Sequence, residues 1–159
     1  MMKAYDRVCW KFLLQVLAKM GFSKHWCKWI KACILGAWFS LIINGKPMGF
    51  SPSTQGIQPG DSLSIVLFII MAKALSRAIS HQHLLKKWKG ALISRTNIFI
   101  THSPFVDDTL LFGLSNVQEA CHILYTLDLY SIVSGQAINA QKSKIYFSNT
   151  KKMVSEKVK

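Results

Sequence analysis

Two adjacent carboxylates interrupt the apolar stretch FVDDTLLFG at residues 105–113. Asp107 and Asp108 are conspicuous because the chain has only seven Asp and Glu against twenty Lys and Arg. Neighbouring carboxylates repel each other and need either water or a cation. Their oxygens suit Mg²⁺, which completes its shell with water or substrate phosphates, although Asp is also common in plain turns. The pair therefore indicates either a solvated turn or a magnesium site for phosphoryl transfer, a chemistry that uses two carboxylate-held ions.

The composition favours one folded, positively charged unit. Half of the 159 residues are hydrophobic and the net charge is +13, which predicts a surface that attracts polyanions, nucleic acid first among them. The longest apolar run, residues 63–72, has about half the length that a membrane-spanning helix requires. We therefore expect a buried core segment there and no membrane partner.

The cysteines and histidines do not form a convincing zinc motif. His25 lies near Cys27 and Cys33, and His81 near His83, but neither group has a second half at zinc-site spacing. The four cysteines include no CxxC pair, and the N-terminal residues lack the apolar stretch of a secretory signal. We expect reduced thiols in an intracellular protein, with the nucleus as one candidate compartment.

Two amphipathic helices are predicted ahead of any strand. Apolar residues recur at helical spacing through residues 9–20, and Gly21 supplies a stop. Ser23 is the expected N-cap of a second helix, in which Trp26 and Trp29 follow the apolar pattern. Core packing is predicted for these tryptophans in preference to base stacking.

A hairpin and a long helix are predicted next. Asn44-Gly45 lies at the centre of the β-rich residues 38–50, and both residues tolerate the positive φ of a two-residue turn. Asp61 is the expected N-cap of a helix over residues 62–80, whose centre is apolar on all sides. We expect that helix to be buried.

The second half of the chain places the aspartates between strands. Residues 81–90 are basic and predict an exposed connector, and residues 91–113 are β-rich. Because successive side chains of a straight strand point to opposite faces, both carboxylates reach one site only at a turn. Asn116 and Glu119 resemble a capping box, and Gly135 ends the following helix.

A single domain is predicted over residues 1–150. Residues 144–147, KIYF, suggest a short strand, and residues 151–159 have too few apolar side chains to promise order. No linker or internal repeat divides the chain.

Five ordered blocks resemble those of a reverse transcriptase. They are KAYDRV at 3–8, INGKPMGF at 43–50, QGIQPGDSLSIVLF at 55–68, FVDDTLLF at 105–112 and SGQAINAQKSKIYF at 134–147. Their order and spacing are similar to those of non-LTR, LINE-like retrotransposons of plants. The resemblance covers nearly the whole chain.

The resemblance implies roles for the aspartates and for Tyr5. FVDD would be the metal-binding turn of a polymerase palm, with Asp107 the stronger Mg²⁺ ligand and Asp108 its neighbour. Tyr5 matches the aromatic residue beneath the sugar of the incoming nucleotide.

The resemblance also implies a nucleotide and template surface. Gln55, Gly56, Gly60 and Asp61 match the loop and helix start that pack against template and nucleotide, where amides can approach phosphate and base. Lys142 matches a lysine near the phosphates of the nucleotide.

The chain departs from the family pattern at three places. The first catalytic Asp of the family would fall one residue ahead of Met1, so we expect the strand that carries it, upstream finger segments, the thumb and any endonuclease to be missing. Pro59 replaces a Gln and removes a backbone donor, and Pro104 interrupts a predicted strand. These departures resemble decay.

The expected fold is α+β, a palm-like antiparallel sheet backed by helices with partial fingers. One reading is RNA-directed DNA polymerisation with Mg²⁺, deoxynucleotides, an RNA template and a DNA primer, by descent and without activity in this chain. The alternative is a non-enzymatic retroelement remnant that binds nucleic acid through its basic surface. Whether the chain is an enzyme stays open at this point.

Overall fold

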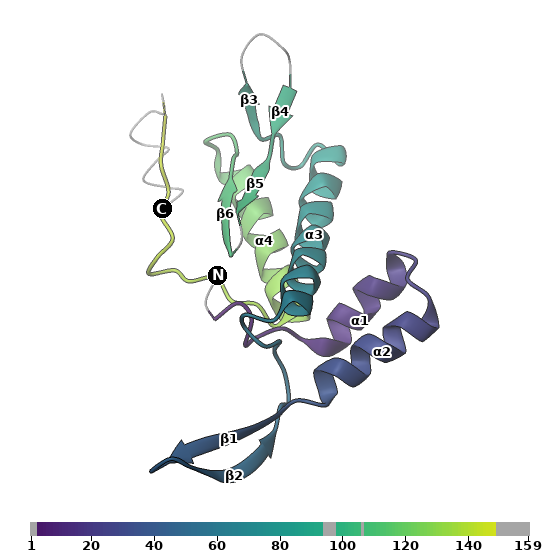
Figure 1. Cartoon of the computed structure of the whole chain (residues 1–159). Coiled ribbons are helices and arrows are strands. Elements are labelled where there is room, and N and C mark those ends of the chain that lie inside the picture. The colour runs from purple at the N-terminus through teal and green to yellow at the C-terminus, as the bar shows by residue number, and fades with distance from the viewer. Residues whose placement is uncertain (1–2, 94–97, 106, 149–159) are drawn as a thin grey trace.

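Two long helices, α3 (Ser62–Leu84) and α4 (Val117–Ser134), form the centre of the molecule (Figure 1). The structure, a computed structural model, describes residues 3–93, 98–105 and 107–148. The two helices pack against each other, and α1 (Trp10–Lys19) contacts both of them. Two apolar clusters fill these contacts, one between α1, α2 (Lys24–Leu35) and α3, and one between α3, α4 and Trp88.

The helical hairpin α1–α2 follows the local signals of the sequence. Gly21 adopts φ +91° just after α1, and the backbone N–H of Trp26 donates to Ser23 Oγ at 3.1 Å, so both predicted boundaries are confirmed. Trp26 packs partly against the core, but Trp29 is 60% exposed. The core-packing prediction is therefore wrong for Trp29, because the buried face of α2 is formed by Ile30 and Ile34 and does not include Trp29.

Helix α3 begins where predicted and runs past residue 80. Asp61 caps it by accepting from the Leu63 N–H at 3.3 Å. Ile65, Val66 and Ile69 are exposed, so the expectation of burial on all sides is wrong for that face. With 23 residues and an 18-residue window of mean hydropathy 1.8, α3 has the length and composition of a membrane span, properties that core helices of other proteins share. Both apolar clusters draw residues from α3, as expected of a core helix.

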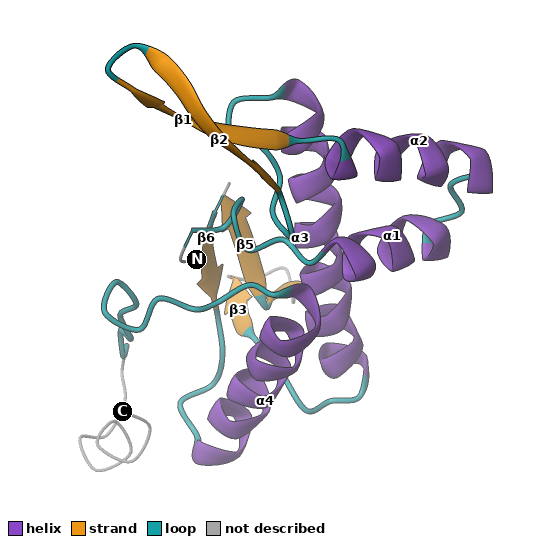
Figure 2. Ribbon diagram, turned by 90° about the horizontal axis from the view of Figure 1, so that it is seen from below, coloured by secondary structure: helices purple, strands orange, loops and turns teal. Residues whose placement is uncertain are grey.

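The described strands form three separate antiparallel hairpins (Figures 1 and 2). Their bounds are β1 (Trp38–Ile43) with β2 (Lys46–Pro52), β3 (Ala91–Ile93) with β4 (Ile98–Ile100), and β5 (His102–Phe105) with β6 (Asp108–Leu111). The α+β class is confirmed, although the strands make three two-stranded sheets where one sheet was expected. The predicted turn Asn44-Gly45 is confirmed, with φ of +50° and +75°. β5 packs on α3, whereas β1–β2 extends away from the helices.

The basic connector at residues 81–90 exposes Lys86, Lys87 and Lys89 as expected, but it is not exposed throughout. Within the basic connector, Trp88 is fully buried, and its Nε1–H donates to the Phe112 carbonyl oxygen at 2.7 Å. Residues 144–147 form no strand in the described structure, because no neighbouring strand pairs with them there. The expected disordered tail, residues 151–159, lies outside the described residues.

The start of α4 is held by an acidic residue in a way that the sequence did not indicate. Asn116 Oδ1 accepts from the Glu119 N–H at 2.7 Å, so the N-cap is confirmed. In a capping box the Glu119 carboxylate would reach back to Asn116. It turns away and accepts instead from three backbone N–H groups, those of Lys89, Gly90 and Leu114, at 3.1–3.2 Å. Glu119 is only 4% exposed and joins three segments at this point.

Tyr130 gives the packing of α3 on α4 a pH dependence. Its hydroxyl donates to the Met71 carbonyl oxygen at 3.2 Å, and burial raises its pKa to about 12, although a hydrogen bond with Ser134 acts in the opposite direction. An unfolded tyrosine titrates near pH ~10. The raised pKa therefore contributes stability that is fully present below pH ~10 and is lost as the pH rises through about 12.

A Tyr130→Phe variant should consequently lose less stability in alkali than the natural protein. Phenylalanine cannot ionise, so the part of the alkaline loss due to Tyr130, about 2–3 kcal/mol, should vanish. Urea unfolding at pH 8, 10 and 11.5 measures the difference between the two proteins. If the unfolding free energies of the two proteins fall equally between pH 8 and pH 11.5, Tyr130 is not the source of the alkaline loss.

Candidate functional site

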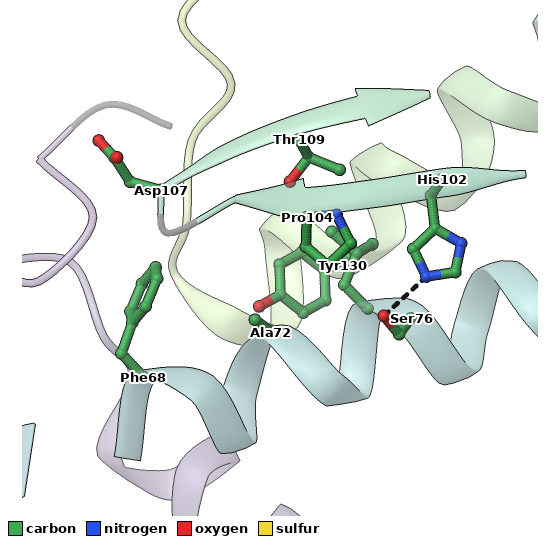
Figure 3. Close-up of a pocket in the computed structure, with 9 residues that line it drawn as sticks. Phe68, Ala72, Ser76, His102, Pro104, Asp107, Thr109 and Tyr130 are labelled. Carbon is green, nitrogen blue, oxygen red and sulfur yellow. Dashed lines mark hydrogen bonds between the residues drawn. The ribbon is translucent and has the colours of Figure 1, made fainter. Parts of the chain in front are cut away.

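The two aspartates lie at the tip of the β5–β6 hairpin. Phe105 pairs with Asp108, which leaves Asp107 in the turn and makes Asp108 the first residue of β6. Both are exposed, and the predicted turn is confirmed. Asp107 also lines a small pocket between the hairpin and the helices α3 and α4 (Figure 3).

Pro104 fits this hairpin without breaking it. Phe105 and Asp108 close a two-residue turn, and the pair that closes such a turn is hydrogen-bonded. The next pair, Pro104 with Thr109, is then a non-hydrogen-bonded pair. The proline nitrogen therefore points away from β6, and β5 is an edge strand among the described residues, as expected for a proline inside a strand.

A histidine fixes the hairpin on α3. His102 Nε2 is hydrogen-bonded to Ser76 Oγ at 2.7 Å, and its Nδ1 to Thr101 Oγ1 at 3.0 Å (Figure 3). Burial, with a smaller contribution from the positive charge of Lys73, holds the His102 pKa below its usual value. No local pattern indicates this hydrogen bond, because His102 and Ser76 are 26 residues apart in the sequence. It sets the position of the aspartate turn over α3.

Phe68 connects the aspartate turn to Tyr5. Phe68 lines the same pocket as Asp107 and points from α3 toward the hairpin tip (Figure 3). The ring of Tyr5 stacks on Phe68 with centroids 4.8 Å apart and planes at 19°. The structure thus brings Tyr5, 102 positions before Asp107 in the sequence, to the same end of α3.

Three segments meet around Tyr5 in what we call the junction, residues 3–10, 55–57 and 134–136. Two backbone bonds tie the first pair of segments: the N–H of Gly56 donates to the Val8 carbonyl and that of Ile57 to the Tyr5 carbonyl, both at 2.9 Å. Trp10 Nε1–H donates to the Gly56 carbonyl at 2.5 Å. The Gly56 amide is therefore already engaged inside the protein, and its predicted contact with a ligand stays a prediction.

The third segment of the junction closes over the first. The Cys9 N–H donates to the Ser134 carbonyl at 2.9 Å, and Arg7 Nε–H to the Gly135 carbonyl at 3.0 Å. Gln136, 3% exposed, donates its Nε2–H to the Ala4 carbonyl at 2.8 Å. These long-range contacts fix the backbone on both sides of Tyr5.

A second cavity, of about 310 Å³, collects part of the predicted nucleotide surface. Its lining includes Gln55, Gly56 and Asp61 together with Asp6 and Cys33. The structure brings these residues together between α2, the N-terminal end of β1 and the start of α3.

Two predicted residues are placed differently. Gly60 is exposed beside the second cavity and is not among the residues that line it. Lys142 is exposed in a turn whose described hydrogen bonds join it to Asn139. Neither residue is brought to Asp107 by a described contact.

The carboxylate pair offers part of a metal shell. Within residues 3–93, 98–105 and 107–148, no three His, Cys, Asp or Glu residues are grouped so that they could hold a metal ion. Asp107 and Asp108 are nevertheless adjacent, exposed oxygen donors. They fit Mg²⁺, which is commonly held by one or two carboxylates with water and substrate phosphates as its other ligands.

Comparisons with known proteins identify the family of the chain. A family model described as "Reverse transcriptase (RNA-dependent DNA polymerase)" matches residues 1–158. The chain is also 28% identical over 106 residues to an uncharacterized mitochondrial protein of Arabidopsis thaliana, an alignment that covers 67% of this chain and 86% of the relative.

Proposed function

This chain belongs to the reverse transcriptase (RNA-dependent DNA polymerase) family, and from that premise we propose that it is a LINE-like, non-LTR nucleotidyl-transfer domain of plant type whose chemistry centres on Asp107 and Asp108. Members of this family generally depend on Mg²⁺ and act on an RNA template and nucleotides. The substrates proposed for this chain are accordingly a primed RNA template and deoxynucleotides.

The observation that carries the proposal is the meeting of Asp107, Phe68 and Tyr5 at one end of α3. A polymerase must hold the sugar of the incoming nucleotide close to the carboxylates that act on its phosphates. Tyr5 is held by the junction and by stacking, so its ring is restrained before any ligand binds. We assign Tyr5 to the sugar and the aspartate turn to the phosphates.

In this proposal Asp107 and Asp108 would hold Mg²⁺. When bound, the ion supplies electrostatic stabilisation of the phosphate charge that grows during transfer. The basic surface of the chain attracts the template, and the two carboxylates would hold the ion that attracts the phosphate end of the nucleotide to the turn. Gln55 and Asp61, which line the second cavity, are assigned to template and nucleotide contacts.

The test is Mg²⁺-dependent binding of a deoxynucleoside triphosphate to the full chain. Asp107→Asn should weaken this binding at least tenfold, because a neutral amide is a much weaker Mg²⁺ ligand than a carboxylate, while binding without Mg²⁺ should not weaken. Isothermal calorimetry with and without Mg²⁺ measures both values. Asp128→Asn, an exposed position on α4, is the matched control and should leave them unchanged. An equal loss in both variants, or no Mg²⁺ dependence in the natural chain, would sink the proposal.

The non-enzymatic remnant remains the second candidate because the described residues contain no third metal ligand near the aspartate pair. Two ions need more carboxylate oxygens than two aspartates provide, and Pro59 removes a donor beside the second cavity. Primer extension separates the candidates. If the natural chain extends a primer and Asp107→Asn abolishes this extension, the chain is an enzyme. If the chain binds nucleic acid but shows no Mg²⁺-dependent nucleotide binding, it is a non-enzymatic remnant.

A further inference from the structure

An exposed aromatic face on α2 is not used by the proposed chemistry. Trp29 is 60% exposed, and the ring of His25, one turn earlier, packs edge-on against it with centroids 4.7 Å apart and planes at 68°. Phe22 stacks on Trp26 with centroids 4.6 Å apart just before this pair. Phe22, His25 and Trp29 are all exposed, and contiguous exposed rings mark contact surfaces more often than a single exposed ring does.

The segment of sequence that contains this face has charges of a single sign. Residues 7–60 contain seven Lys and Arg and no Asp or Glu. Three of the seven are exposed on α2 itself: Lys28 lies beside this face, and Lys24 and Lys31 lie on other sides of the helix. A surface of this kind attracts a polyanion along its whole length.

We propose that the exposed face of α2, formed by His25, Trp29 and Lys28, binds single-stranded nucleic acid by stacking a base on Trp29 while the lysines neutralise the flanking phosphates. This combination of a positive track with an exposed aromatic ring is how proteins hold single strands without reading their sequence. His25 restrains the indole edge-on, so little rotamer freedom is lost when a base stacks on it.

A second copy of the chain is a poorer occupant of this face. A two-fold contact would bring the face against itself and place the α2 lysines of one copy beside those of the other. No acidic side chain between residues 7 and 60 is available to offset that repulsion. The charge therefore favours nucleic acid over self-association.

The position of the face suggests how a bound strand would relate to the rest of the molecule. Cys33 lies one helical turn after Trp29 and lines the second cavity. Trp29 is therefore near the rim of the cavity that contains Gln55 and Asp61. The inference takes its partner class from the proposed function and adds a contact that needs neither Asp107 nor a metal.

The experiment compares two oligomers of about 12 residues, one of single-stranded DNA and one of abasic sugar-phosphate, by fluorescence anisotropy with the full chain. Trp29→Ala should weaken binding of the DNA roughly tenfold and leave the abasic oligomer unaffected. Lys28→Ala should weaken both and reduce the salt slope by about one. Trp38→Ala removes a tryptophan that is 63% exposed in the same acid-free segment, and as the matched control it should change binding by less than twofold.

Three results would overturn the inference. They are unchanged DNA binding in Trp29→Ala, an equal loss in Trp38→Ala, and a Trp29-dependent dimer in sedimentation that competes with the oligonucleotide. The oligonucleotide titration contains neither Mg²⁺ nor nucleotide. If the proposed metal site is wrong, the expected oligonucleotide binding is therefore unaffected. If the proposed role of the α2 face is wrong, the expected Mg²⁺-dependent nucleotide binding is unaffected.

Discussion

Replacing Glu119 by alanine is expected to destabilise the protein by at least about 3 kcal/mol. Three backbone N–H groups, those of Lys89, Gly90 and Leu114, donate to one oxygen of this buried carboxylate. Each buried donor left without an acceptor costs about 1–3 kcal/mol, and hydrogen bonds to a charged group are at the strong end of the range. The same substitution releases the connector that carries Trp88 from the start of α4.

Two further variants isolate the cause of this effect. Glu119→Gln keeps an acceptor oxygen but loses the charge, so its loss of unfolding free energy should be intermediate. Asp128→Ala removes an exposed acid from the same helix and should change stability by less than ~0.5 kcal/mol. Urea unfolding monitored by circular dichroism measures all three. A loss in Glu119→Ala no larger than that in Asp128→Ala would refute the bonding network.

Gly135→Ala is expected to have an effect of similar size, through the junction. Gly135 has φ +76°, and an added Cβ would collide with the carbonyl oxygen of Arg7. Backbone lies on the other side of this contact, so no side chain can rotate away. The residues that must shift are those bonded to residues 134–136, and among them is the segment that carries Tyr5.

Gly21→Ala is the control for Gly135→Ala. Gly21 has φ +91°, but an added Cβ there meets no atom within 4 Å. It should cost only the conformational penalty, about 1–2 kcal/mol. Gly135→Ala should cost clearly more and should also weaken Mg²⁺-dependent nucleotide binding, whereas Gly21→Ala should not. Equal unfolding free energies for the two variants would contradict this prediction, because they would show that the junction accommodates the added Cβ without cost.

Local signals in the sequence predicted the boundaries of the elements well. Ser23, Asp61 and Asn116 act as N-caps, and Asn44-Gly45 forms its turn, because each depends on residues within a few positions. The roles of Glu119 and Trp88 depend on contacts 24–30 residues away, which no local pattern contains. Strand formation at residues 144–147 failed for a related reason, since a strand needs a partner as well as suitable residues.

The candidate site divides in the same way. The turn at Asp107 was predictable, because two polar residues between apolar arms indicate a hairpin tip. The stacking of Tyr5 on Phe68 and the hydrogen bond between His102 and Ser76 were not predictable from pattern, since they join segments far apart in sequence. The exposure of Trp29 was missed because residues 26, 29 and 30 all follow one apolar spacing, and only the neighbouring helix decides which of them is covered.

The hairpin β1–β2 has a further consequence for how the molecule comes apart. Every residue of both strands is exposed, and the described contacts of the ribbon are chiefly those of its own ladder. An isolated two-stranded ribbon is marginally stable in water. Opening this hairpin breaks few contacts with the core, so β1–β2 forms a separate unit that opens at low free energy. Its amide protons should exchange with solvent without global unfolding, whereas the amide protons of α3 and α4 should exchange only when the whole protein unfolds.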